Sequence, residues 1–224
     1  MTETLTKYWF LVDFNLFKKL SMKTMMELCE VLVMHRYSKG ARIELGSSNK
    51  RSVFFLKKGS VKIVSSKSGV VKFILGRGNI FGELGLYQHS GEVDEVAYTL
   101  EESVVCVFSA EQMNALMEKH KSLKNKVLKI YGLRYRRLER RLEDLVNKDS
   151  ATRIKEYVCD YITTFGTLVD GRLEARKLLL HKDIAHLTST SRQTVNNVLV
   201  KLRREGCIDY NSKVISMPNT EKLE

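Results

Sequence analysis

Proline and paired cysteines are scarce in this chain of 224 residues. One proline and 13 glycines argue against a disordered or low-complexity composition. The four cysteines, Cys29, Cys106, Cys159 and Cys207, lie far apart and form no CxxC pair. Each has apolar neighbours, which favours small core side chains over metal ligands. The sequence therefore predicts neither a disulfide framework nor a metal site, and it predicts a reducing cytoplasm as the setting.

Long apolar segments are also missing. The longest apolar runs, such as residues 104–108, are far too short to span a bilayer. The opening stretch, MTETLTKYWFLVDF, has no basic leader before its brief apolar run, so no signal peptide is predicted. We expect a cytoplasmic protein that makes no membrane contact. Whether the closing Leu223-Glu224 is native stays open.

Charge is plentiful and unevenly distributed. The net charge is +12, with hydrophobic residues at 43%, and the length suits two domains. Residues 121–224 hold 22 Lys and Arg against 13 Asp and Glu, or +9, whereas residues 1–120 hold 16 against 13, or +3. A basic surplus in one half fits a polyanionic partner, with nucleic acid ahead of an anionic membrane.

Short alternating apolar pieces separated by glycines fill the region from Tyr37 to Phe108. They are SVFFLKKG, SVKIVSS, GVVKFILG, EVAYTLE and SVVCVF. Such pieces with glycine turns are typical of an antiparallel sandwich or roll. A short helix over residues 17–32 is predicted to precede them. Its apolar face comprises Phe17, Leu20, Met25 and Leu28.

A helical period returns at Ser109 and lasts to about Val146. It predicts a long helix of about 25 residues, which would span about 40 Å. Its apolar stripe comprises Val127, Ile130, Tyr131, Leu138, Leu142 and Leu145. A helix of this length with a narrow seam usually pairs with another helix, which predicts a homodimer. Arg134, Arg137 and Arg141 crowd the seam, so a helix lying on its own sheet is the alternative.

A break follows the long helix. Asp149 or Ser150 can cap a new helix over residues 151–165, which Gly166 would close, and Asp170-Gly171 marks a tight turn. The sequence thus predicts three parts. They are a β-roll sensor domain over residues 1–120, a dimerisation helix and hinge over 121–148, and a DNA-binding domain over 149–224.

Residues 181–206 have the pattern of two helices joined by a tight turn. Ile184 and Leu187 can face a core from the first helix, and the second carries one apolar stripe. The stripe comprises Val195, Val198, Leu199 and Leu202. Arg, Gln and Asn lie opposite, and these residues can form paired hydrogen bonds with purine edges in a major groove. The pattern indicates a DNA-binding helix-turn-helix, with an ordinary helical hairpin as the alternative.

Both ends of the second helix carry capping signals. Ser191 offers an N-cap hydroxyl and Gly206 stands where a glycine would end the helix. Ser189 stands in the turn, and Leu180 offers no hydroxyl cap to the first helix, so the start of that helix is uncertain. The tail, CIDYNSKVISM, predicts two short strands around Asn211-Ser212, in the position of a wing.

In order and spacing, these motifs resemble the cyclic-AMP receptor and fumarate–nitrate regulator (CRP/FNR) superfamily of bacterial transcription factors. The motifs are Phe17…Leu20-Ser21, YSKGARI, FFLKKGSVKI, NIFGELGL at residues 79–86, Arg153-Ile154 and SRQTV at residues 191–195. The resemblance implies an α+β fold: an N-terminal antiparallel β-roll, a long dimerisation helix and a C-terminal winged helix-turn-helix. The roll would sense a signal, and the second helix of the pair would enter the major groove.

The resemblance also implies roles for single residues. Arg192 matches a guanine-reading arginine, and Ser191 and Thr194 match hydroxyls that touch phosphate. Gln193 stands where a glutamate often reads bases and Asn197 where an arginine often does, so the half-site should differ from that of the best-known members. The predicted DNA contacts are Ser191, Arg192, Gln193, Thr194, Asn196, Asn197 and Lys201.

The partners implied are double-stranded DNA with two half-sites related by two-fold symmetry, and a second copy of the chain bound through the long helix. RNA polymerase and an unidentified small-molecule effector are further candidates. The effector pocket that the resemblance implies comprises Gly82, Glu83, Leu84, Gly85, Asp94, Glu95, Leu138 and Glu139.

This pocket departs from the members that bind cyclic AMP. Where they hold the cyclic phosphate with Arg-Ser or Arg-Thr, this chain has Asp94-Glu95, and carboxylates repel a phosphate. Leu138-Glu139 replaces the hydroxyl pair that the long helix presents to the purine. Cyclic AMP is therefore not expected. An insertion in the alignment is the alternative, with Arg77 as the nearest upstream cation.

No cofactor is predicted. An iron–sulfur cluster needs closely spaced cysteines, and Cys29 stands alone in the N-terminal region. Haem lacks support because His35, His89 and His120 are scattered. The leading function is a dimeric, sequence-specific transcription regulator rather than an enzyme. The alternatives are a non-specific nucleic-acid-binding protein and a cupin-like metalloenzyme, although the roll sequence has no HxH or HxxxH pair.

Overall fold

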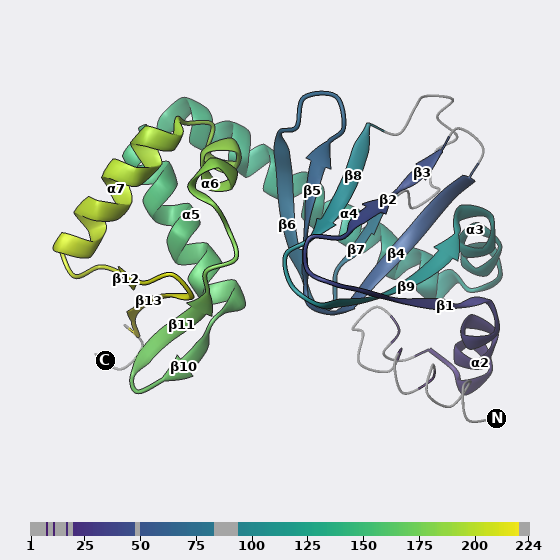
Figure 1. Cartoon of the computed structure of the whole chain (residues 1–224). Helices are drawn as coiled ribbons and strands as arrows, with labels where there is room; N and C mark the ends of the chain where they lie inside the picture. Colours follow the sequence, from purple (N-terminus) through teal and green to yellow (C-terminus); the bar gives the residue numbers. More distant parts are fainter. Residues whose placement is uncertain are drawn as a thin grey trace. The chain divides into compact units, whose positions relative to one another are not determined.

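The structure is a computed structural model, in which residues 8, 11, 17, 20–47, 50–82 and 94–219 are described (Figure 1). The chain divides into two compact units, residues 1–137 and 138–224. The dividing point lies inside the longest helix, α4 (Lys121–Asn147). The predicted division into three parts stays a prediction.

The first unit contains two antiparallel sheets. One has the order β1-β9-β4-β3, with β7 also paired to β4, and the other has the order β2-β8-β5-β6. The strands are β1 (Val33–Tyr37), β2 (Arg42–Glu44), β3 (Gly46–Ser47), β4 (Lys50–Lys58), β5 (Ser60–Ser65), β6 (Val71–Gly76), β7 (Ile80–Gly82), β8 (Glu95–Thr99) and β9 (Ser103–Ser109). The predicted antiparallel roll is thus confirmed. The five predicted pieces form β4, β5, β6, β8 and β9, whereas the other four strands were not predicted.

Strand β4 supplies both cores of this unit, because successive side chains of a strand point to opposite faces. Val53 and Phe55 pack with the helices, whereas Phe54 and Leu56 face the second sheet. Phe55 contacts the ring of Phe17, with the centroids 5.1 Å apart. The roll therefore has two apolar cores, one between its two sheets and one between a sheet and the helices.

Helix α2 (Met22–Val31) begins later than the sequence pattern predicts. The hydroxyl of Ser21 accepts a hydrogen bond from the Thr24 N–H at 3.2 Å, which caps the helix at this point. Phe17 lies in a turn before the helix, although it is buried as expected. The apolar spacing alone did not reveal this cap.

Helix α3 (Ala110–Lys119) precedes α4, which is 27 residues long. In the first half of α4, Leu123 and Val127 are buried and Ile130 packs on the same core. Arg134 donates a hydrogen bond to the carbonyl of Ile80 on β7. The first half of the helix therefore lies on its own roll.

The described part of the second unit contains the end of α4, three further helices and a four-stranded antiparallel sheet of order β10-β11-β13-β12. Its elements are α5 (Ser150–Phe165), β10 (Thr167–Val169), β11 (Arg172–Arg176), α6 (His181–Thr188), α7 (Arg192–Arg204), β12 (Asp209–Tyr210) and β13 (Val214–Pro218). The long helix, the helix-turn-helix and the wing strands are confirmed, as is the α+β fold class.

Local signals located the ends of these elements well. Asp149 caps α5 and Gly166 closes it. Asp170 and Gly171 have φ angles of 46° and 79°, the left-handed values that a tight hairpin turn requires. The strands on either side of this turn, β10 and β11, were not predicted.

The cysteines carry free thiols. Cys29 and Cys106 are buried in the core of the first unit, and burial raises the pKa of the Cys106 thiol. Cys159 and Cys207 are half-buried. The prediction of small core side chains is thus confirmed for two of the four.

Candidate nucleic-acid interface

Helix α6 begins without a hydroxyl cap. Leu180 occupies the N-cap position, and the Asp183 carboxylate accepts a hydrogen bond from the Leu180 N–H at 3.0 Å. The acidic side chain at the third helical position thus binds the N–H of the N-cap residue, although Leu180 itself offers no side-chain cap to the first turn. This settles the start of the helix, which the sequence left uncertain, at His181.

The turn between α6 and α7 depends on one residue with an unusual backbone. Ser189 has a φ angle of 53°, in the left-handed region that glycine adopts most easily. The Thr190 N–H then donates to the Ala185 carbonyl at 2.9 Å. The chain therefore completes this turn without a glycine.

Helix α7 is capped by two side chains that were predicted to touch phosphate. The Ser191 hydroxyl accepts from the Thr194 N–H at 3.0 Å, and the two hydroxyls lie 2.8 Å apart. Gly206 follows the helix with a φ angle of 73°, as the glycine signal predicts. Both hydroxyls stay at the surface end of the helix, so capping and phosphate contact are compatible.

The two faces of α7 differ sharply in exposure. Val195, Leu199 and Leu202 are buried, at 0%, 1% and 4% exposure. The exposed residues of the helix include Arg192, Gln193, Asn196, Asn197 and Lys201, together with Val200, Arg203 and Arg204. The first five of these are predicted DNA contacts, and the other two of the seven, Ser191 and Thr194, form the cap. All seven predicted contacts therefore lie on α7 or, in the case of Ser191, at its N-cap.

A hollow on this face adds a residue that the sequence did not suggest. It is lined by His181, Arg192, Gln193 and Asn196. His181 belongs to α6, and its place beside α7 follows from how the two helices pack. No periodicity within either helix could have indicated it.

Arg153 ties the end of the long helix to the helix-turn-helix. Its guanidinium donates to the Thr188 carbonyl at 3.0 Å, to the Lys148 carbonyl at 2.6 Å and to the Ser189 carbonyl at 3.5 Å. Lys148 and the two turn residues are thereby held by one planar group. Arg153-Ile154 carried part of the resemblance, but sequence reasoning gave the arginine no role.

Two further contacts fasten the same region. Arg141, on the last turns of α4, donates to the His186 carbonyl of α6 at 3.1 Å. The Lys148 amine lies 2.6 Å from Asp144 and 2.5 Å from Glu156, and these carboxylates raise its pKa. Within the second unit, the end of α4 is thus bonded to both α5 and α6.

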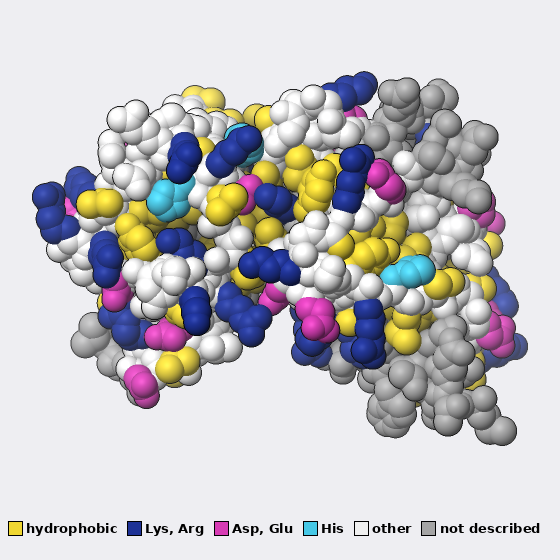
Figure 2. All heavy atoms as spheres, in the orientation of Figure 1, with side chains coloured by type: hydrophobic (Ala, Val, Ile, Leu, Met, Phe, Trp, Pro, Cys, Tyr) yellow, Lys and Arg dark blue, Asp and Glu magenta, His cyan; other side chains and the backbone are white. Residues whose placement is uncertain are grey.

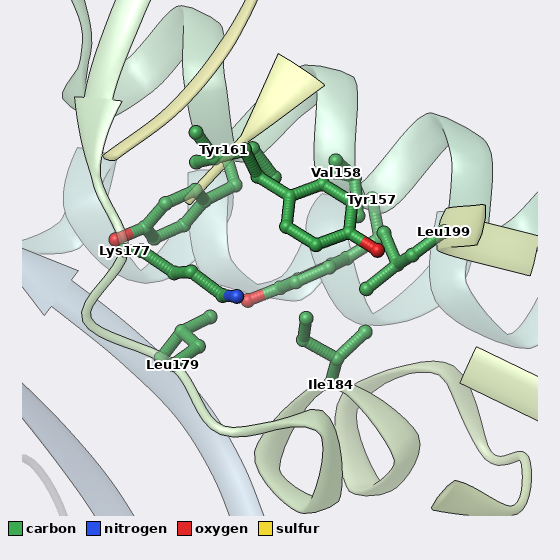
Figure 3. Close-up of a pocket in the computed structure, with 9 residues that line it drawn as sticks. Tyr157, Val158, Tyr161, Lys177, Leu179, Ile184 and Leu199 are labelled. Atoms are coloured by element: carbon green, nitrogen blue, oxygen red, sulfur yellow. The ribbon is translucent and has the colours of Figure 1, made fainter. Parts of the chain in front are cut away.

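The wing is held against the helices by aromatic packing. The Tyr210 ring of β12 lies 4.6 Å from the Lys177 amine and 5.2 Å from the Arg203 guanidinium carbon, at cation–π distances. Tyr210 also lines a small pocket, into which Lys177 reaches (Figure 3). The pocket is otherwise lined by Tyr157, Val158, Tyr161, Leu179, Ile184, Leu199, Tyr210 and Ile215. The wing and α7 therefore share one apolar support.

Lys and Arg side chains spread over the second unit on the face that Figure 2 shows. Most of its basic residues are exposed, including Lys182, Arg192, Lys201 and Arg204. This distribution agrees with the +9 surplus counted in residues 121–224. The unit presents positive charge around the polar face of α7, as binding to a polyanion requires.

The predicted effector pocket is described only in part. Glu83, Leu84 and Gly85 lie outside the described residues. Gly82 has a φ angle of 79°, and a Cβ atom there would lie 2.4 Å from the Ser52 carbonyl oxygen, so only glycine fits. Leu138 and Glu139 are exposed and belong to the second unit.

Asp94 and Glu95 are engaged in local contacts. The Asp94 carboxylate accepts from the Ser66 hydroxyl at 2.8 Å, from the Ser65 hydroxyl at 3.0 Å and from the Lys67 N–H at 3.0 Å. These bonds, first that of Ser66, lower the pKa of Asp94. Glu95 pairs with Lys72 at 3.1 Å. Asp94 therefore carries negative charge at neutral pH, and Glu95 beside it is engaged in an ion pair, on the side of the roll where β8 begins.

Among the residues that the structure describes, no group of three His, Cys, Asp or Glu side chains could hold a metal ion. No helix in the described ranges is long and apolar enough to cross a membrane.

Comparison with known proteins agrees with this architecture. The family model described as a cyclic nucleotide-binding domain matches residues 34–120, and that of a Crp-like helix-turn-helix domain matches residues 158–224. A cyclic-nucleotide-binding roll followed by a winged helix-turn-helix defines the class of protein. The chain belongs to the CRP/FNR family.

Individual relatives are distant. The chain is 26% identical over 150 residues to a CRP-like cAMP-activated global transcriptional regulator of Mycobacterium tuberculosis, covering 67% of this chain and 66% of that protein. It is 25% identical over 176 residues to a global nitrogen regulator of Synechocystis, covering 76% and 78%. The structure of a CooA mutant from Carboxydothermus hydrogenoformans superposes with a TM-score of 0.68 at 21% identity, covering 94% of each chain. This last likeness concerns the fold alone.

The Arg153 contacts predict a measurable effect on the turn. Replacing Arg153 with Ala should lower the free energy of unfolding of the second unit by about 1–3 kcal/mol, because charge-assisted hydrogen bonds to three carbonyls are lost. Amide hydrogen exchange at Ser189 and Thr190 should become faster. Lys155→Ala, which removes the same charge from an exposed site on α5, is the control. Unchanged exchange in the turn of the Arg153 variant would contradict the assignment.

Proposed function

We propose that this chain is a dimeric, sequence-specific DNA-binding transcription regulator of the CRP/FNR type. The observation that carries the proposal is the exposed face of α7, where Arg192, Gln193 and Asn197 lie opposite a fully buried stripe. An α-helix of this kind fits the major groove of B-DNA. A DNA partner supports a cytoplasmic location, and RNA polymerase is a further candidate partner.

The chemistry of the face suggests what it reads. Arg192 can donate two parallel hydrogen bonds to guanine, and Gln193 or Asn197 can pair with adenine. Asn196 and Lys201 extend the same face. Ser191 and Thr194, at the start of the helix, are placed to touch the phosphate backbone. The surrounding positive charge supplies attraction that does not depend on sequence.

The second half of α4 supports a dimer. Apolar side chains there are exposed in the single chain, with Leu138 at 52%, Leu142 at 65% and Leu145 at 38%. With the exposed Leu128 and Tyr135 and the half-buried Tyr131, they recur at alternating steps of three and four residues, which is the pattern of a coiled-coil seam. Two copies paired along this seam would present two recognition helices to successive major grooves, about 34 Å apart.

The effector is proposed to be something other than cyclic AMP. The negatively charged Asp94, and Glu95 in its ion pair with Lys72, stand where the resemblance implies an arginine and a hydroxyl residue. Two of the relatives differ in their names, since one is a cAMP-activated global transcriptional regulator and the other a global nitrogen regulator. Family membership therefore leaves the ligand of this roll open, and its charge argues against a cyclic phosphate.

The base-reading role of Arg192 can be tested on DNA recovered by selection from random sequences with the full chain. Arg192→Ala should weaken binding by about 1–3 kcal/mol and relax the preference at one base pair of each half-site. Binding is measured by fluorescence anisotropy on the selected duplex and its single-base variants.

Arg204→Ala is the matched control, since it removes the same charge from the far end of α7. It should weaken binding almost equally on all duplexes. If Arg192→Ala also weakened binding equally everywhere, the arginine would contact phosphate only. If the selection returned no preferred sequence, a non-specific nucleic-acid-binding protein would be the better description.

The seam predicts the effect of a charge on assembly. Leu142→Glu places one carboxylate from each copy in an apolar interface, so the dimer should dissociate at micromolar concentration. Arg140→Glu introduces the same residue on the opposite side of α4 and should leave the dimer intact. Analytical ultracentrifugation distinguishes the 25.8 kDa single chain from a species of twice that mass. A dimer that survived Leu142→Glu would exclude this seam as the contact.

The acidic pair predicts the response to cyclic AMP. Isothermal titration of the full chain with cyclic AMP should show no binding at concentrations up to about 1 mM, because a carboxylate beside a phosphate is repulsive. The affinity for the selected duplex should be unchanged by the nucleotide. Micromolar binding would show that another cation, such as Arg77, takes the place of the missing arginine.

A further inference from the structure

The hollow beside the recognition helix contains a titratable group. His181 opens α6, and its ring lines the hollow with Arg192, Gln193 and Asn196 of α7. All three neighbours can donate hydrogen bonds, and a protonated imidazole would add another donor and a positive charge. The hollow thus gathers donors from two helices on the face proposed to meet DNA.

The surroundings of His181 disfavour protonation of its ring in the free protein. Partial burial lowers its pKa, and the positive charges of Lys177 and Arg192 lower it further. Lys177 comes from the segment before α6 and Arg192 from α7. On α6 itself, Lys182 is exposed, and the Asp183 carboxylate is bonded to the Leu180 N–H. The charges that act on the ring, among the described residues, are therefore both positive.

Such a site favours an anion. Two groups that are or can become cationic, His181 and Arg192, line the hollow together near the exposed start of α7. The backbone phosphates are the anionic groups of DNA. A phosphate placed at the hollow would oppose the two positive charges that disfavour the protonated ring.

We propose that His181 is a further DNA-contacting residue, which takes up a proton as its imidazole meets a backbone phosphate at the edge of the hollow. The inference rests on the proposed DNA-binding function and adds to it a dependence on pH. The sign follows from linkage. Since the complex binds one more proton than the free protein, affinity rises as the pH falls through the pKa of the bound ring, and it levels off below the lower pKa of the free ring.

The test uses the full chain and a duplex recovered from the random-sequence selection. From pH 8 to pH 5.5, the affinity of the wild-type protein should rise by about tenfold for each unit by which DNA raises the pKa of His181. His181→Gln keeps a neutral donor of similar size but cannot take up a proton, so this part of the dependence should disappear. His186→Gln, the same change later in α6, should retain it.

Salt provides an independent readout. The logarithm of affinity falls with the logarithm of salt concentration, with a slope of about −0.9 for each phosphate neutralised. At pH 5.5, His181→Gln should reduce the magnitude of this slope by about 0.9 per subunit, and at pH 8 it should leave the slope unchanged. If the salt slopes of the wild-type protein and His181→Gln differed by the same amount at both pH values, His181 would contact DNA without proton uptake. That result would overturn the proposal.

Direct titration completes the test. The His181 ring signals, followed by NMR with and without the duplex, should give a higher pKa in the complex. An unchanged or lower pKa would refute the inference even if His181→Gln weakened binding. Failure of the DNA-binding function itself would show differently, because no duplex would be selected at any pH.

Discussion

The burial of one stripe of α7 is the constraint on which the proposed function depends. Val195, Leu199 and Leu202 are almost completely removed from water, and each buried apolar side chain of this size contributes about 1.5–3 kcal/mol. Rotating the helix about its axis would expose this stripe and bury Arg192, Gln193 and Asn197 without partners. The cost of both changes holds the polar face outward. An apolar core thus decides which side chains are available to a duplex.

The backbone of the turn before α7 is fixed by hydrogen bonds from Arg153. Ser189 adopts a left-handed conformation without the freedom of glycine, and the Arg153 guanidinium binds the carbonyls of Thr188 and Ser189. Hydrogen bonds to a charged group are stronger than those between neutral groups, which helps to hold a turn that a serine does not favour. The same guanidinium also donates a hydrogen bond to the backbone carbonyl of Lys148. The end of α4 and the recognition turn are therefore linked through one side chain within the second unit.

Helix α4 serves two environments along its length. Its first half is anchored in the core of the roll through Leu123 and Val127. The Arg134 guanidinium donates a hydrogen bond to the Ile80 carbonyl of β7, and burial lowers the pKa of this group. Its second half exposes leucines that the single chain does not cover. The sequence offered a dimer seam and a helix on its own sheet as alternatives. The first half of α4 adopts the second arrangement, and the exposed leucines beyond it are consistent with the first.

What the sequence by itself determined was local and periodic. It comprised five strand pieces of the roll, the long helix, the caps at Asp149 and Ser191, the glycine stops and the polar face of α7. Helical and strand periods, caps and turns arise from neighbours within a few residues, so a single chain displays them. The strands β2, β3 and β7 have three residues or fewer, which is too few to show a period. Strand β1 is as long as β8, but it has no fully buried side chain that would mark an apolar alternation. The Ser21 cap was missed, because the apolar spacing over residues 17–32 predicted a helix that starts earlier than α2 does.

Only the tertiary structure decided the contacts between distant segments. Arg153 reaches residues 35 and 36 positions away, and His181 joins the recognition face because α6 and α7 cross beside one another. Such neighbours depend on how helices pack, which is set by the fit of whole apolar faces rather than by any local pattern. For this reason the sequence indicated which helix should read DNA, whereas the residues that orient and adjoin it became visible only in the folded chain.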